Sequence, residues 1–271
     1  MTVMERNQPS RHRTIFLSDV HLGTRGCQAE LLLDFLRRNE SETLYLVGDI
    51  VDGWRLKRWW YWPQSHNDVV QKIMRKARKN TNVIYIPGNH DEAARQYCQL
   101  TFGEVKVEQD AIHEMADGRR LLVIHGDQFD GIVRYARWLA ILGDWAYAAA
   151  LRLNTIFNWG RRKLGLPYWS LSAWAKNKVK TAVNFIGDFE TCLANEARRE
   201  GAEGVICGHI HHATIRDIGG IRYINTGDWV ESCTAVAEHH DGRFELIRFA
   251  ERNADQRRDH LQLAPPLAQA S

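Results

Sequence analysis

Histidines are concentrated in one short stretch of the chain, VICGHIHHATI at residues 205–215. His209 and His211 lie two residues apart, on what reads as a tight loop between two strands. Imidazoles with this spacing can turn into one site as metal ligands, although an H-x-H pair by itself is more often a polar loop. We interpret His212 as a solvated loop histidine. The pair therefore needs partners from elsewhere in the chain.

Polar residues that can bind a metal also follow four other short apolar runs, in the motifs SDVH, GDIVD, GNHD and HGD. Carboxylate, imidazole and amide oxygen together favour a first-row divalent ion over calcium, which prefers oxygen ligands, and over structural zinc, which usually takes thiolates. Seven candidates exceed the needs of one ion and predict two ions about 3.5–4 Å apart with a shared carboxylate, an arrangement typical of phosphoryl transfer. The seven candidates are Asp19, His21, Asp49, Asn89, His125, His209 and His211.

The elements that position these motifs alternate as strand and helix in the first third of the chain, an order typical of parallel strands with right-handed crossovers. Later strands follow one another through short turns and read as antiparallel. We expect two facing sheets, helices outside them, and the polar loops gathered at one rim. The predicted helices span residues 28–38 and 66–78, and the predicted strands span residues 14–18, 43–47, 83–86, 121–124, 204–207, 213–217, 221–225, 234–238 and 244–249.

Length and composition favour one globular domain, because 271 residues with 44% hydrophobic content can bury one sizeable core. A formal net charge of +3 does not predict a nucleic-acid partner, and five scattered cysteines without a C-x-x-C motif suit a reducing compartment. The polar N-terminus lacks a secretory signal, and the longest apolar stretch, at 138–151, is shorter than the ~20 residues that span a bilayer. We therefore expect a cytoplasmic protein with no membrane-spanning helix.

A long segment at residues 131–190 interrupts the alternation and reads as a mostly helical insertion. It holds nine Arg and Lys residues against three acids, a local net charge of +6, together with five of the ten tryptophans. We interpret residues 1–250 as one domain that includes this insertion, and residues 251–271 as a disordered tail. The insertion is either a lid that binds substrate or a helical hairpin whose tryptophans pack on the sandwich.

The five motifs occur complete, and in the same order, in a known family. Residues 14–249, with their D-x-H, GD-x-x-D, GNH[DE], H and GH-x-H blocks, resemble the calcineurin-like metallophosphoesterases. The resemblance implies an α/β fold, a four-layer α-β-β-α sandwich with a helical lid insertion, and metal-dependent phosphoester hydrolysis. Manganese is the first choice for both ions, with iron, zinc or cobalt as alternatives. The family pattern assigns one ion to Asp19, His21, Asp49 and His211, and the other to Asp49, Asn89, His125 and His209.

Two further residues of the family pattern would act beside the metals rather than bind them. His90 follows Asn89, and Asp52 could hydrogen-bond the far nitrogen of its ring, which fixes the tautomer and raises the pKa of the imidazole. The imidazolium could then neutralise phosphoryl charge or protonate a leaving oxygen, so we interpret His90 and Asp52 as catalytic. We interpret Asp91 as the N-cap of a helix that begins at residues 93–97.

Within the family, the chain looks like the UDP-2,3-diacylglucosamine hydrolases of lipid A synthesis, which release UMP and a lipid monophosphate and use the insertion as a lid. That group has Arg at the position of His90, so the resemblance is to a diverged branch. The basic run at 161–163 would face anionic lipid on the cytoplasmic side of the inner membrane. Trp145 and Leu142 would contact acyl chains, and the diphosphate and nucleotide would contact Ser172, Lys176, Asn177 and Lys180.

Other functions remain open at this point. The same centre could act on a soluble phosphodiester, nucleotide or phosphoprotein, and basic residues interleaved with aromatics could bind a single nucleic-acid strand. A catalytically silent scaffold is disfavoured because all seven candidate ligands are present, and nucleophilic catalysis is disfavoured because no G-x-S-x-G motif occurs. The sequence does not predict the oligomeric state.

Two groups of residues near or outside the motifs have simpler interpretations. A tryptophan cluster beside the GDIVD motif either walls the substrate cleft or seals the edge of the sheet. Six histidines lack partnered motifs and are interpreted as surface or strand residues. The tryptophans are Trp54, Trp59, Trp60 and Trp62, and the histidines are His12, His66, His113, His239, His240 and His260.

Overall fold

The structure is a computed structural model that describes residues 8–129 and 189–251. The chain divides into two compact units, one formed by Met1–Gly126 with Ala197–Ser271 and the other by Asp127–Glu196. Every strand in the described ranges belongs to the first unit. Apart from residues 189–190 and residue 251, the predicted insertion and the predicted tail lie outside the described residues. None of the described helices is long and apolar enough to cross a bilayer.

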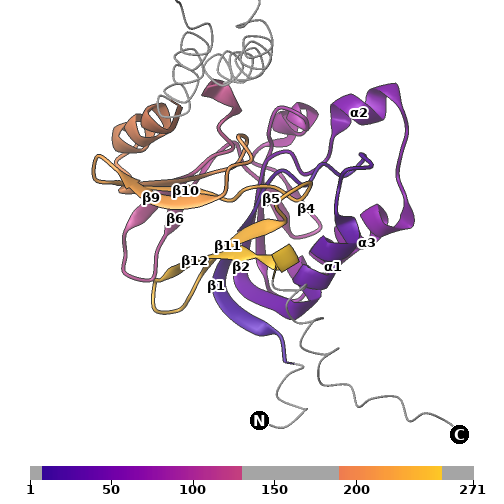
Figure 1. The fold of residues 1–271 in the computed structure, drawn as a ribbon, viewed down its shortest axis with the longest axis horizontal. Coiled ribbons are helices and arrows are strands. Elements are labelled where there is room, and N and C mark those ends of the chain that lie inside the picture. The colour runs from indigo at the N-terminus through magenta and orange to yellow at the C-terminus, as the bar shows by residue number, and fades with distance from the viewer. Residues whose placement is uncertain (1–7, 130–188, 252–271) are drawn as a thin grey trace, which may run out of the picture. The chain divides into compact units, whose positions relative to one another are not determined.

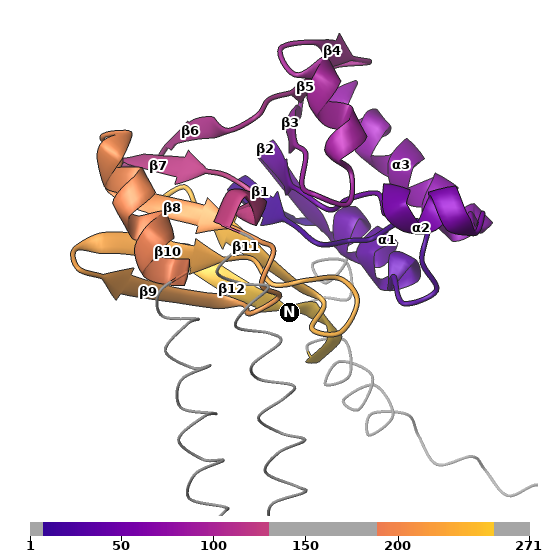
Figure 2. The same cartoon turned by 90° about the horizontal axis from the view of Figure 1, so that it is seen from above.

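Two mixed sheets form the framework of the first unit (Figures 1 and 2). The seven-stranded sheet has the order β12-β11-β1-β2-β3-β5-β4, and the five-stranded sheet has the order β6-β7-β8-β10-β9. The strands are β1 (Ser10–Leu17), β2 (Asn39–Val47), β3 (Asn82–Ile86), β4 (Thr101–Phe102), β5 (Val105–Val107), β6 (Ala111–Glu114), β7 (Arg120–Val123), β8 (Gly204–Cys207), β9 (Thr214–Ile218), β10 (Ile221–Asn225), β11 (Thr234–Glu238) and β12 (Phe244–Arg248). The helices are α1 (Ala29–Arg38), α2 (Gly53–Arg58) and α3 (Gln64–Ala77), with 3₁₀ helices η2 (Glu92–Tyr97) and η3 (Asp127–Phe129), and residues 189–199 are also helical.

The strand and helix predictions are confirmed for the main elements. Strands β1, β2 and β3 pair in parallel, with α1 and α3 as the crossovers between them. Strand β10 pairs antiparallel with β9, and β11 pairs antiparallel with β12. The sequence reasoning missed α2 and the short strands β4, β5 and β6, because runs this short carry too few residues to show a period.

The core lies on both faces of the seven-stranded sheet, which is why its central strands are almost continuously apolar. In β1, Ile15 and Leu17 pack into the cluster that contains the buried faces of α1 and α3. Phe16 points to the opposite face, where its ring stacks on Tyr45 at a centroid distance of 4.9 Å. That second cluster also contains Ile206 of the five-stranded sheet, so it fills the space between the sheets. The α/β sandwich predicted from the sequence is confirmed.

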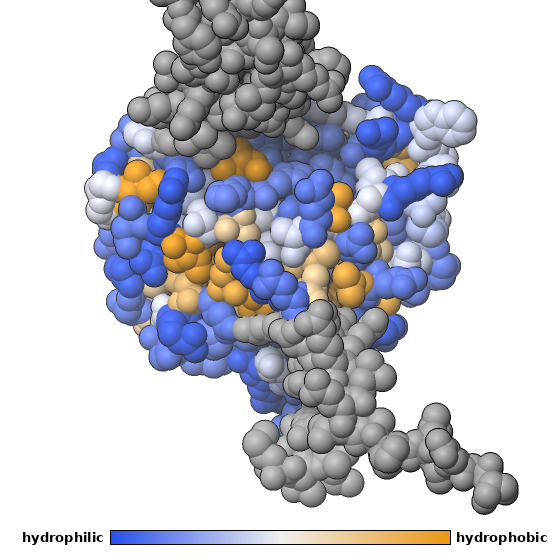
Figure 3. Space-filling view, in the orientation of Figure 1, coloured by the Kyte–Doolittle hydropathy of each residue, from blue (hydrophilic) through white to orange (hydrophobic). Residues whose placement is uncertain are grey.

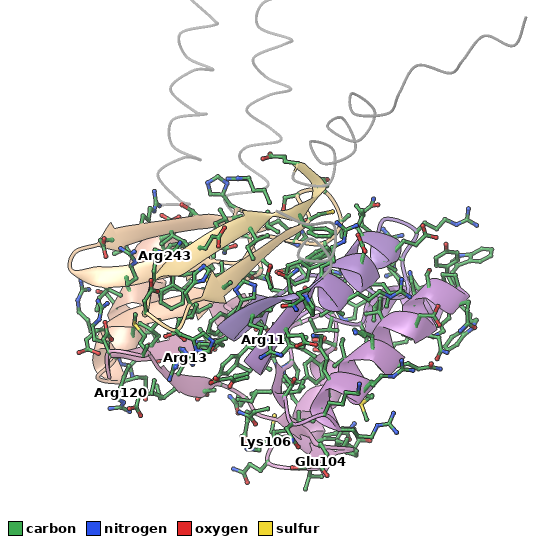
Figure 4. The ribbon with its side chains drawn as sticks, turned by 90° about the horizontal axis from the view of Figure 1, so that it is seen from below. Arg11, Arg13, Glu104, Lys106, Arg120 and Arg243 are labelled. Carbon is green, nitrogen blue, oxygen red and sulfur yellow. The ribbon has the colours of Figure 1, made fainter. Side chains whose placement is uncertain are left out.

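A buried ion-pair network ties the two sheets together. Glu238 of β11 is fully buried, and His113 Nε2 of β6 lies 2.8 Å from its Oε2. Arg13 Nη1, labelled in Figure 4, donates to both carboxylate oxygens at 2.7 and 2.9 Å. The backbone amide of Ala116 donates to the same carboxylate at 2.8 Å. His113, which we interpreted as a surface or strand residue, lies in β6, where it has a structural partner 125 residues away.

Replacing Glu238 with glutamine should lower the free energy of unfolding by about 2–3 kcal/mol at pH 7, because Arg13 loses its counter-charge and the hydrogen bonds to a charged carboxylate are lost. Burial by itself disfavours the carboxylate, but hydrogen bonds from His113, Ala116 and Arg13 outweigh it and lower the pKa of Glu238. A group with a lowered pKa stabilises the fold above its unfolded pKa and loses that effect as the pH falls through its folded pKa. Urea unfolding should therefore show the difference between wild type and variant shrinking below about pH 4.5, the ordinary glutamate value. A difference independent of pH between 3 and 7 would contradict this account.

Candidate metal centre

The five polar motifs follow the carboxyl ends of β1, β2, β3, β7 and β8, and the loops that carry them hydrogen-bond to one another. The amide of Asp19 donates to the carbonyl of Gly48 at 3.0 Å, and the amide of His21 donates to the carbonyl of Asp49 at 2.9 Å. Within the five-stranded sheet, the amide of Gly208 donates to the carbonyl of His125 at 3.2 Å. Across the two sheets, the amide of His209 donates to Asp19 Oδ2 at 2.9 Å. The loops therefore meet at one rim of the sandwich, as the strand order predicts.

Within the described residues, three groups of side chains bring potential ligand atoms within 4.8 Å of one another. The first two share His21, and the last two share Asp49. His209 and His211 fall into different groups, and the family resemblance assigns them to different ions. The groups are Asp19 with His21 and His211, His21 with Asp49 and His90, and Asp49 with His125 and His209.

Asp49 lies at the middle of the cluster. Its Oδ1 is 3.5 Å from His125 Nε2, and its Oδ2 is 3.9 Å from His21 Nε2 and 4.0 Å from His90 Nε2. The backbone amide of His90 also donates to Oδ1 at 2.9 Å, which fixes the orientation of the carboxylate. The carboxylate of Asp49 thus faces His125 with one oxygen and His21 and His90 with the other. This is the position that a ligand bridging two ions would occupy.

The backbone of the site residues is unusual, because five of them have φ in the left-handed region that non-glycine residues rarely adopt. Only nine non-glycine residues have positive φ within residues 8–129 and 189–251, so this region is concentrated at the cluster. Such conformations cost free energy and persist where the surrounding structure imposes them, commonly at functional sites. The five are Asp19 (49°), His21 (52°), Asp49 (54°), His209 (70°) and His211 (54°).

Glycines in the motifs provide space for the ligand side chains rather than flexibility. A Cβ at Gly88 would clash with Asp49 Oδ1 and would lie 2.6 Å from His125 Nε2. A Cβ at Gly208 would clash with Asp19 Oδ2. The glycines of GNHD and GHIH therefore let the loops approach the side chains from neighbouring strands.

Electrostatics keep the carboxylates of the cluster ionised. Burial by itself raises the pKa of Asp19, but hydrogen bonding to His211 and the charge of His125 outweigh it and hold this pKa well below its usual range. The pKa of Asp49 is likewise lowered, since the effects of His125 exceed that of burial. In turn, Asp49 and Asp19 overcome the burial of His125 and raise its pKa to about 10. Without a metal, protonated histidines supply the positive charge that balances these carboxylates. A bound cation would supply that charge instead, and metal binding displaces such protons.

Two buried ligand atoms support the fit to a metal ion. His21 Nε2 and Asn89 Oδ1 are buried, and neither has a hydrogen-bond partner in the described part of the chain. A buried polar atom without a partner is uncommon in a folded protein and calls for a bound group. Imidazole nitrogen, amide oxygen and carboxylate together are a donor set for a first-row divalent ion.

Comparison with known families decides the classification. A family model described as calcineurin-like phosphoesterase matches residues 12–213. The chain belongs to the calcineurin-like phosphoesterase family. Members of this family use divalent metal ions, so this phosphoesterase is a metal-dependent hydrolase and the cluster around Asp49 is its candidate metal centre.

Several relatives with assigned functions are similar to this phosphoesterase over most of its length. A UDP-2,3-diacylglucosamine hydrolase from Neisseria meningitidis serogroup B is 27% identical over 225 residues, which cover 79% of this chain and 88% of the relative. One from Chromohalobacter salexigens is 25% identical over 227 residues, covering 80% of this chain and 88% of the relative. A solved archaeal phosphodiesterase aligns with 86% of this chain and 98% of its own, at 12% identity and a TM-score of 0.41. The named relatives are distant, and their names alone do not assign a substrate to this phosphoesterase.

His90 and Asp52 lie together at the edge of the phosphoesterase centre, as predicted. His90 Nδ1 is 3.1 Å from Asp52 Oδ2, and the side chain of His90 remains 26% exposed. Burial lowers the pKa of His90, but the close contact with the carboxylate of Asp52 and the charge of Asp49 outweigh it and raise this pKa. Asp52 also lies 3.4 Å from His21 Nδ1 and caps α2 by accepting from the amide of Arg55. Asp52 therefore orients two imidazoles of the phosphoesterase centre and starts a helix.

The N-cap interpretation of Asp91 is wrong. Asp91 precedes η2, but its side chain makes no capping hydrogen bond to that helix. The buried carboxylate instead accepts from the backbone amide of Gly88 in its own loop and from three amides of the loop after β2. Those three donors are Asp49 at 3.2 Å, Ile50 at 2.8 Å and Val51 at 3.3 Å. Residue 91 thus holds together the two loops that carry Asp49, Asn89 and His90, a long-range role that the local pattern did not indicate.

Changing Asp91 to alanine should leave up to four buried amides without an acceptor. We expect the free energy of unfolding to fall by at least about 3 kcal/mol, because each unsatisfied buried donor costs about 1–3 kcal/mol. The matched control is Glu92→Ala, since that neighbouring side chain is exposed. Chemical denaturation of the two variants gives the comparison, and equal stabilities would rule out this role for Asp91.

One supporting segment of the phosphoesterase centre was missed. The loop after β10, NTGDW at residues 225–229, packs beneath the loop that carries Asp19. Ser18 Oγ donates to the carbonyl of Gly227 at 2.9 Å, and the amide of Trp229 donates to the carbonyl of Asp19 at 3.0 Å. A Gly-Asp pair directly after a buried strand repeats the GDIVD pattern and was the available signal.

The remaining predicted site residues lie outside the part of the chain that the structure describes. The predicted acyl and nucleotide contacts all fall in the second unit, outside the described residues. These are Leu142, Trp145, Ser172, Lys176, Asn177 and Lys180.

Proposed function

We propose that this phosphoesterase hydrolyses the pyrophosphate bond of a lipid-linked nucleotide such as UDP-2,3-diacylglucosamine, releasing UMP and a lipid monophosphate. The observation that carries the chemistry is the central position of Asp49 between two sets of imidazole and carboxylate ligands. The substrate class is supported by five curated relatives that share the name UDP-2,3-diacylglucosamine hydrolase. In this proposal the enzyme works on the cytoplasmic face of the inner membrane, where it makes peripheral contact.

The proposed ligand sets follow the three groups of side chains, with Asn89 added because its buried oxygen has no partner in the described residues. Two divalent ions in such a centre polarise phosphoryl oxygens, and manganese is our first choice, with iron, zinc or cobalt as alternatives. One ion would be held by Asp19, His21, Asp49 and His211, and the other by Asp49, Asn89, His125 and His209.

His90 is the proposed proton donor. Its ring is partly exposed while its Nδ1 faces Asp52, so Nε2 is the atom available to a substrate. Asp52 and Asp49 favour the imidazolium, which can donate a hydrogen bond to a phosphoryl oxygen or a proton to the departing phosphate oxygen. Asp52 would fix the tautomer of His90. Because its carboxylate also accepts a hydrogen bond from the first turn of α2, it is held in place and would limit rotation of the imidazole.

A soluble phosphodiester, nucleotide or phosphoprotein is the second candidate substrate. The observation that favours it is His90 itself, because the lipid A hydrolases resembled by this chain have Arg at that position. Nothing in the Asp49 cluster requires a lipid, since its imidazoles and carboxylates would act only on the phosphoryl group.

A substrate screen tests the proposal. Manganese-loaded enzyme would be incubated with UDP-2,3-diacylglucosamine, a CDP-linked lipid, a cyclic nucleotide and bis(p-nitrophenyl) phosphate, and products would be identified by mass. We expect UMP and the lipid monophosphate from the first compound, at a kcat/KM well above that for the small diester. Hydrolysis of the soluble compounds alone would reject the lipid-linked substrate while keeping the phosphoesterase chemistry.

A further inference from the structure

Tryptophans of the segment that follows the GDIVD motif are exposed rather than packed. Trp59 and Trp60 are 83% and 77% exposed, and Trp54 is 44% exposed. Helix α2, which begins this segment, has no buried residue. Large aromatic side chains are costly to leave in water, so a contiguous exposed group of them marks an interaction surface.

Positive charge accompanies these tryptophans. Residues 53–62, GWRLKRWWYW, contain three basic residues and no acid, so ten residues carry a charge equal to the +3 of the whole chain. The three, Arg55, Lys57 and Arg58, are exposed. We call residues 54–60 the Trp-Arg surface. Figure 3 shows deep blue side chains beside pale ones, of nearly neutral hydropathy, over α2 at the upper right.

The inner residues of the segment fix it to the first unit. The side chain of Leu56 lies against Gly23, and partly buried Trp62 packs on the core beside α1 and α3. Trp62 also meets the ring of His66 at 5.6 Å, edge to face. The segment is thus held in place while its tryptophans stay in solvent. Figures 1 and 2 both show α2 at the outer edge of this unit.

The same segment is joined directly to the metal centre. The amide of Gly53 donates to the carbonyl of His90 at 2.9 Å, and Asp52 caps the helix while it faces His90. The ring of Trp54 lies 4.3 Å from the ring of His90. Whatever binds the Trp-Arg surface is therefore held beside the phosphoesterase centre.

We propose that the Trp-Arg surface docks the enzyme on an anionic lipid bilayer. Tryptophan rings favour the headgroup region of a membrane, and exposed Arg and Lys are attracted to anionic lipid. A surface that combines both, without acids, matches this partner in charge and in hydropathy. The surface lies outside residues 131–190, the segment in which the sequence placed membrane contact. The purpose of docking rests on the proposed lipid-linked substrate, whereas docking itself does not.

Vesicle co-sedimentation of the full-length enzyme tests the proposal. The probes are vesicles of phosphatidylcholine alone and vesicles with about one third phosphatidylglycerol, without substrate. We expect binding to the anionic vesicles only. Trp59→Ala with Trp60→Ala, and separately Lys57→Glu with Arg58→Glu, should each lower the partition coefficient at least about tenfold.

Matched controls are available elsewhere on the same unit. Phe102→Ala removes a 49% exposed aromatic of β4, and Lys79→Glu reverses an exposed charge in the turn that follows α3. Both controls should bind anionic vesicles like wild type. All variants should keep the wild-type melting temperature and turn over bis(p-nitrophenyl) phosphate normally, because the changed residues are exposed and outside the metal centre.

Each outcome decides the proposal. Equal binding by wild type and the tryptophan variant, or no binding by wild type, overturns it. Losses as large in Phe102→Ala and Lys79→Glu also overturn it, since attraction would then be general. If the variants of the Trp-Arg surface lose binding to a single-stranded oligonucleotide while their vesicle binding is unchanged, the surface would be assigned to nucleic acid instead. If vesicle binding depends on the surface but UDP-2,3-diacylglucosamine is not hydrolysed, docking stands and the proposed substrate fails.

Discussion

Asp49→Asn is expected to lower kcat by at least about 10³-fold and to leave fewer than two divalent ions bound per chain. The carboxylate is central to the cluster, and its charge offsets the mutual repulsion of two cations, which a neutral amide cannot do. Asparagine has nearly the same shape and can still accept from the amide of His90, so the loop should keep its conformation. Metal analysis of the purified variant and initial rates on bis(p-nitrophenyl) phosphate measure both effects.

The matched control for this change is Asp241→Asn, in an exposed turn between β11 and β12. It should retain wild-type metal content and rate. Two tightly bound ions and near-normal turnover in Asp49→Asn would show that no carboxylate bridge exists here and would remove the dinuclear centre from the proposal.

The second large effect is expected at His90, where alanine should reduce kcat by about 10²–10⁴-fold while both ions stay bound. The imidazolium is proposed to stabilise or protonate the phosphoryl group. Metal binding by the other side chains does not depend on this function. Asp52 and Asp49 raise the pKa of His90 and so favour the imidazolium in wild type. His212→Ala, in an exposed loop, removes a neighbouring imidazole and should leave the rate unchanged.

The same experiment distinguishes a second role for His90, that of a metal ligand. Potential ligand atoms of His90, His21 and Asp49 lie within 4.8 Å of one another, so the ring of His90 is close enough to serve as a metal ligand. Loss of one ion in His90→Ala would place this imidazole among the metal ligands. A rate equal to wild type would show that His90 neither binds metal nor assists the reaction.

The sequence predicts the candidate centre well because the ligands follow strand ends, where parallel pairing brings distant motifs to one rim. His209 and His211 illustrate the limit of this reasoning. Their spacing suggests one shared site, and only the family pattern separates them onto different ions. In the structure both residues have left-handed backbone, a conformation that is uncommon for any residue other than glycine.

Interactions between residues far apart in the chain could not be predicted. Asp91 reads locally as a cap, yet three of its four backbone donors lie 40 to 42 residues earlier. His113 has no motif, and its partner Glu238 lies on the last antiparallel pair of strands. Exposed Trp59 and Trp60 contradict the usual burial of aromatics, so composition alone favoured the wrong environment for them.

The bond between Asp19 Oδ2 and the amide of His209 joins residues 190 positions apart, one after the first strand and one after β8. Bringing such distant points together costs the unfolded chain much entropy, as closing a long disulfide loop does. An ion held by Asp19 and His211 would act as a removable cross-link between the two sheets. Its binding free energy would then be available only to chains in which both sheets are complete, so chelation should lower the melting temperature of the first unit.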